Sequence, residues 1–91
     1  MILVKNANGT SRWEKPSTGE NSWLEYWENC TGQKATHCGH VSCHTSQNLV
    51  GAHVQIVGSN ELYITPLCKS CNKLSGNFLV DTELVRVPSG K

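Results

Sequence analysis

The part of this chain that decides the fold runs from residue 38 to residue 72 and contains CGHVSC (38–43), GAHV (51–54) and YITPLCKSCN (63–72). Four residues separate Cys38 from Cys43, and two separate Cys68 from Cys71. Zinc prefers four soft ligands in a tetrahedron, and close pairs of cysteines separated by a hairpin-length segment are typical of such sites. We therefore predict that these four sulfurs bind one zinc ion.

Two alternatives to this ligand set follow from neighbouring residues. Cys30 could replace one sulfur, although its distance from Cys38 in the sequence favours a free, partly buried thiol. His37, His40 and His44 surround the first cysteine pair and allow mixed cysteine and histidine ligation. Four cysteines suffice without them, and histidines beside a turn commonly face solvent.

The size of the chain is the reason that it needs a metal. With 91 residues, of which 37% are hydrophobic, it forms one small domain with a limited core. Such scaffolds commonly depend on a metal or on disulfides. The five cysteines cannot all pair within the chain, and the start of the sequence lacks the pattern of a secretory leader. We expect a cytoplasmic location, where paired thiols indicate metal more often than disulfides.

The charge restricts the partners that we expect. A net charge of +1 argues against a strongly basic nucleic-acid binder, so contact with phosphates would depend on a local cluster of basic residues. The sequence contains no apolar run of the roughly 18 residues that a membrane span needs, so we expect no membrane. A protein partner or an oligomer stays open.

The first third of the chain predicts a short strand at 2–4, a loop at 9–20 with Trp13 against the core, and then a helix. Ser22 begins this helix of about two turns, because Ser22 and Glu25 form a capping-box pattern. Trp23 and Trp27 are four residues apart and share a helix face. They are either a hydrophobic plug beside the zinc site or a platform for stacking bases, and a small core favours the plug.

The middle of the chain predicts a β-hairpin, with strands at 49–57 and 62–65 and a turn between them. Alternation places His53 on the face of Gly51, with open space in front of it, and Ala52 on the apolar face. Pro66 is expected to end the second strand.

After the hairpin we predict a helix at about 70–74, closed by Gly76, and one or two strands within 78–87. Lys69 and Lys73, four residues apart, would share a face of that helix. This face either contacts phosphate or is simply solvated. The fold class is therefore α+β.

The order of these features resembles the treble-clef zinc domains of the HNH (His-Me finger) endonuclease superfamily. The resemblance covers about 37–77 and is based on GAHV around His53 and on PLCKSCN from Pro66 to Asn72. It implies a small zinc-stapled domain with a knuckle, a hairpin and a short helix. The N-terminal helix that begins at Ser22 precedes this domain and is not part of the resemblance. The single domain 1–91 would then consist of an extension (1–36), a zinc and HNH-like core (37–77) and a strand and tail (78–91).

The resemblance also implies roles for two residues. His53 matches the general base that takes a proton from the attacking water. Asn72 matches the residue that binds a divalent ion, usually magnesium, which polarises the scissile phosphate. The zinc would be structural, because four thiolates leave no open coordination position. Active members usually carry an acidic residue or a histidine before the base, where this chain has Ala52.

Three functions are compatible with these residues. The first is a zinc-binding HNH-like domain that associates with DNA or RNA with little or no catalysis. The second is an active metal-dependent HNH endonuclease that uses His53 and Asn72. The third is a zinc adaptor module that binds a protein through exposed aromatic side chains.

Overall fold

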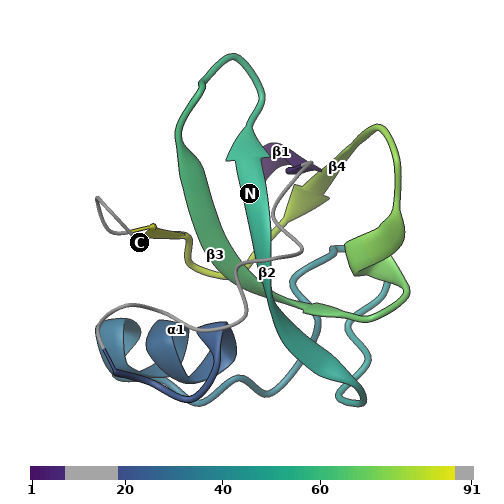
Figure 1. Ribbon diagram of the computed structural model, residues 1–91. Helices are drawn as coiled ribbons and strands as arrows, with labels where there is room; N and C mark the ends of the chain where they lie inside the picture. Colours follow the sequence, from purple (N-terminus) through teal and green to yellow (C-terminus); the bar gives the residue numbers. More distant parts are fainter. Residues whose placement is uncertain (8–18, 88–91) are drawn as a thin grey trace.

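The computed structural model describes residues 1–7 and 19–87, which form an α+β fold with one antiparallel sheet and one α-helix (Figure 1). The sheet has the strand order β4-β1-β2-β3-β5. The elements are β1 (Ile2–Asn6), α1 (Trp23–Thr31), β2 (Leu49–Ile56), β3 (Leu62–Cys68), η1 (Cys71–Lys73), β4 (Asn77–Val80) and β5 (Val85–Arg86). Within the described residues, no helix is long and apolar enough to cross a membrane. Most of the predicted 9–20 loop, including Trp13, lies outside these residues.

The first strand, β1, is longer than predicted and lies inside the sheet. It pairs with β2 on one side and with β4 on the other, both antiparallel. Val4, at its centre, is fully buried. The residues that the sequence assigned to an extension therefore supply part of the core.

The hairpin of β2 and β3 has the predicted strands, but Pro66 does not end β3. Pro66 pairs with Gly51, and β3 continues to Cys68. The carbonyl of Pro66 accepts a hydrogen bond from the backbone N–H of Gly39 (2.7 Å). Because the nitrogen and the carbonyl of a strand residue face the same side, the nitrogen of Pro66 points away from β2 and breaks no hydrogen bond of the hairpin.

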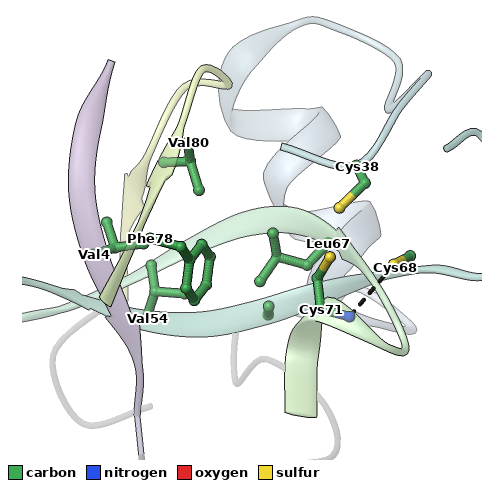
Figure 2. Close-up of a cluster of buried hydrophobic side chains, with 9 residues drawn as sticks. Val4, Cys38, Val54, Leu67, Cys68, Cys71, Phe78 and Val80 are labelled. Carbon is green, nitrogen blue, oxygen red and sulfur yellow. Dashed lines mark hydrogen bonds between the residues drawn. The ribbon is translucent and has the colours of Figure 1, made fainter. Parts of the chain in front are cut away.

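The two faces of the sheet carry different cores. Ala52 and Val54 on β2 pack with three of the four predicted zinc ligands, and this cluster contains Val4, Cys38, Ala52, Val54, Leu67, Cys68, Cys71, Phe78 and Val80 (Figure 2). Ile64, which pairs with His53, packs on the other face against Trp23, Tyr26 and Trp27 of α1. The sheet therefore separates the cysteines from the aromatic residues of the helix.

Helix α1 starts at the predicted Ser22 cap, with the Glu25 carboxylate bonded one residue before the position that a standard capping box uses. The Ser22 hydroxyl accepts a hydrogen bond from the N–H of Glu25 (3.1 Å), and the Glu25 carboxylate accepts one from the N–H of Asn21 (3.0 Å). Trp23 and Trp27 are buried, as the plug interpretation predicts. Its predicted location beside the zinc site is wrong, because the helix covers the opposite face of the sheet.

The segment after β3 is less helical than predicted. Only η1, a single 3₁₀ turn, forms there, so Lys69 lies outside it and does not share a helix face with Lys73. Gly76 has the expected left-handed conformation (φ 85°). It does not cap the turn, because Leu74 is the C-cap residue of η1. The predicted strands of the last part of the chain form as β4 and β5.

Candidate metal centre

The four cysteines predicted to bind zinc come together in space. Cys38 and Cys43 lie on the loop before β2, Cys68 ends β3, and Cys71 begins η1. Their four Sγ atoms lie within 4.8 Å of one another, and the Sγ atoms of Cys43 and Cys68 are 3.8 Å apart. Zinc–sulfur bonds of about 2.3 Å in a tetrahedron place sulfurs about 3.8 Å apart. The donor set and its spacing therefore fit a zinc ion.

Backbone hydrogen bonds hold both cysteine pairs in their turns. The N–H of Cys71 donates to the Sγ of Cys68 (3.4 Å), as Figure 2 shows. The N–H of Cys43 donates to the carbonyl of His40 (3.0 Å), and the N–H of Cys38 donates to the carbonyl of Thr45 (2.7 Å). The last two of these bonds hold the loop that carries the first pair in its shape without the help of a metal.

Gly39 allows this loop to approach β3 closely. A Cβ at Gly39 would lie 3.0 Å from the carbonyl oxygen of Pro66 and would overlap the side chain of Thr82. The small residue in the first turn therefore brings Cys38 within reach of the second pair.

Burial opposes ionisation of two of these thiols, so a set of four thiolates requires a cation between them. Burial raises the pKa of Cys38, and burial together with neighbouring thiols raises the pKa of Cys71. Burial also acts to raise the pKa of Cys68, but hydrogen bonds from the N–H of Cys71 and from neighbouring thiols outweigh it and lower that pKa. Four sulfurs this close cannot all be thiolates without a positive charge between them, and zinc supplies one.

The alternatives for the ligand set find no support in this geometry. Cys30 is exposed and does not belong to the group of four sulfurs. It is a free thiol, as expected, but an exposed one. His40 stacks on Phe78 with ring centroids 4.9 Å apart and accepts a hydrogen bond from the N–H of Ser42. His37 and His44 belong to a separate group with Asp81.

The surroundings of His53 differ from those predicted. The alternation along β2 is as expected, but the space in front of this face is filled by α1. His53 is only 8% exposed, and its ring lies edge-to-face with Trp23 at a centroid distance of 4.8 Å. At Gly51, a Cβ would overlap backbone atoms of Trp23 and Leu24. The predicted open space is therefore wrong, because the helix backbone rests directly on the strand.

The two residues with implied catalytic roles lie on different sides of the sheet. His53 faces α1, whereas η1, which carries the exposed Asn72, packs through Cys71 into the cluster on the other face. Burial lowers the pKa of His53 to about 4. The ring is therefore neutral at pH 7, but it is enclosed by the helix.

One residue of a second group of possible metal ligands, Asp81, could not be identified from the sequence. Asp81 lies beside His37 and His44, far from them in the chain. The cluster of histidines around the first cysteine pair was visible in the sequence. Its acidic partner was not, because only the pairing of the loop with the end of β4 brings it there.

Comparisons of this chain with family models, curated proteins and solved structures gave no match. The likeness to HNH domains therefore depends on the residues quoted for it.

Proposed function

We propose that this chain is a zinc-stapled, HNH-like domain that associates with nucleic acid and does not use His53 for catalysis. The observation that carries the proposal is the convergence of Cys38, Cys43, Cys68 and Cys71 within 4.8 Å at the junction of the loop, β3 and η1. Knuckle, hairpin and second cysteine pair follow one another as in a treble clef, with a 3₁₀ turn in place of the helix. With four thiolates bound, zinc has no position for water and acts as a structural ion.

The geometry gives little support to nuclease activity at His53. A general base must reach its water within hydrogen-bonding distance, and Trp23 covers this ring. The magnesium that the resemblance implies would depend on Asn72. The carboxylate of Glu61 is not available to it, because Glu61 pairs with Arg86 (2.7 Å) at the opposite end of β3, about 20 Å of strand away.

The adaptor alternative also loses its basis. It requires exposed aromatic side chains on α1, but Trp23 and Trp27 are buried against the sheet. The Nε1–H of Trp27 is the only polar group of this side chain. It donates to the carbonyl of Glu83 (2.8 Å) and is therefore used inside the protein.

Association with nucleic acid is supported by basic residues around the second cysteine pair. Lys69 and Lys73 are exposed on either side of Cys71. They place two exposed positive charges within five residues, on a chain whose overall charge is only +1. A zinc ion with four thiolates carries a net charge of about −2, so these lysines could instead serve to balance the metal site. Only contact with phosphates predicts that removing these lysines weakens the binding of nucleic acid.

The test is binding of a labelled DNA and a labelled RNA to the zinc-loaded chain, followed by fluorescence anisotropy over a range of salt concentrations. We expect affinity to fall as salt rises, and the Lys69→Gln/Lys73→Gln variant to bind more weakly with a salt slope reduced by about 1 to 2. Lys34→Gln, at an exposed lysine beside α1, is the control and should bind like the wild type. If the wild type binds neither probe, or if Lys69→Gln/Lys73→Gln and Lys34→Gln have the same affinity, then Lys69 and Lys73 do not bind nucleic acid.

Plasmid nicking in magnesium or manganese tests the catalytic alternative on the same samples. We expect no nicking by the wild type. Nicking that disappears in His53→Ala, with zinc content unchanged, would establish the endonuclease and contradict the proposal.

A further inference from the structure

We propose that His37, His44 and Asp81 form a second metal site, distinct from the four sulfurs, for a divalent ion such as Zn²⁺ or Co²⁺. The Nε2 of His44 and the Oδ2 of Asp81 are 2.7 Å apart, and the Nε2 of His37 and the Oδ1 of Asp81 are 3.6 Å apart. One ligand atom from each residue lies within 4.8 Å of the other two. Metal–nitrogen bonds of about 2.0–2.1 Å place neighbouring ligands about 3.3 Å apart. Small side-chain movements therefore suffice to enclose an ion.

The backbone holds these three residues next to one another. His37 and His44 directly flank the first cysteine pair, and the hydrogen bond from the N–H of Cys38 to the carbonyl of Thr45 closes the loop between them. Asp81 is fixed opposite by the hydrogen bond of its N–H to the carbonyl of Gly39 (2.9 Å). The turn that binds the structural zinc thus also positions the second site.

The environment of His37 suits a metal ligand. Its Nδ1 lies 3.1 Å from the Thr36 hydroxyl. A histidine that donates its Nδ1–H to such a partner keeps the lone pair of Nε2 free, and here Nε2 faces Asp81. The backbone of His44 has a positive φ of 54°, which is uncommon for a residue other than glycine and aims its ring at the same carboxylate.

The donor set indicates the kind of ion. Two imidazoles and one carboxylate suit late first-row divalent metals rather than magnesium or calcium. The side chains of His37, His44 and Asp81 are 41%, 47% and 31% exposed, so the ion can enter from solvent. Three protein ligands leave at least one position for water, unlike the closed site of four sulfurs.

The test is titration of the zinc-loaded full chain with Co²⁺, followed by equilibrium dialysis and visible absorption. We expect one Co²⁺ ion to bind as the second equivalent of metal. Its spectrum should show d–d bands but not the charge-transfer absorption of a cobalt–thiolate site. Asp81→Asn and His37→Gln/His44→Gln should weaken this second equivalent by more than about 100-fold, beyond the usual loss for a residue that only supports a ligand. Thr36→Val should weaken it by about tenfold.

Two controls separate this proposal from the proposed function and from a purely structural role. His40→Asn, in the same loop but outside the group, should bind both equivalents. The Asp81→Asn variant keeps a side-chain oxygen that can hydrogen-bond to His44, so a purely structural pair would tolerate this change, whereas a metal site would not. The tightly bound zinc should remain in every variant, so loss of that ion instead counts against the four-sulfur site. Absence of a second equivalent in the wild type, or its persistence in Asp81→Asn, would overturn the inference.

Discussion

At the scale of single residues, His53 shows how burial changes what a histidine can do. In the sequence it matched a general base, but the structure encloses it under Trp23, where desolvation lowers its pKa from 6.5 to about 4. The folded state therefore holds a neutral ring at pH values where the unfolded chain binds a proton. Alternation in β2 correctly predicted the face on which His53 lies. It could not reveal the covering helix, because that contact depends on residues far away in the chain.

The shifted pKa of His53 predicts a pH dependence of stability. Its full contribution is present above pH 6.5, and it is lost as the pH falls toward about 4, because only the unfolded state takes up the proton in this range. At about 1.4 kcal/mol for each pKa unit, the free energy of unfolding should fall by up to about 3 kcal/mol. Urea denaturation at several pH values measures it.

His53→Gln provides the comparison, since glutamine does not titrate. Carboxylates and zinc ligands affect both proteins equally, so the difference between their pH profiles isolates the ring of His53. Identical profiles between pH 6.5 and 4 would show that the histidine is not buried as described.

At the scale of elements, the contact of α1 with β2 is what places the aromatic core. A helix of nine residues is not stable alone, and α1 is held by Trp23 and Trp27 packing on the sheet. The sequence predicted the helix and its Ser22 cap from local signals. It did not predict which face of the sheet the helix covers, and it placed the end of β3 too early because the orientation of Pro66 relative to β2 is not a local property.

Gly51→Ala tests this contact. Because the new Cβ would overlap backbone atoms of Trp23 and Leu24, the helix must move, and we expect a loss of about 1–3 kcal/mol or more in the free energy of unfolding. Tryptophan emission should shift to longer wavelength. Gln55→Ala, at a half-buried position of the same strand, should stay within about 0.5 kcal/mol of the wild type. Equal stability of Gly51→Ala and Gln55→Ala would show that α1 does not rest on the strand.

At the scale of the whole molecule, the four cysteines bring three separate segments of the chain together at one place. The cysteine cluster links the loop, the end of β3 and η1 to the core that contains Val4, Phe78 and Val80 (Figure 2). The spacing of the cysteines in the sequence was enough to predict that these four sulfurs come together. The interior position of β1 in the sheet and the proximity of Asp81 to two histidines were not predictable, because both depend on long-range pairing that involves β4.

The central claim is that four sulfurs bind one zinc ion on which the fold depends. X-ray absorption at the zinc edge of the purified chain tests it most directly. We predict one tightly bound zinc with four sulfur neighbours at about 2.3 Å, and for Cys68→Ala both loss of this zinc and loss of the folded state. A zinc-free wild type that folds, or a first shell with fewer than four sulfurs, would contradict the account.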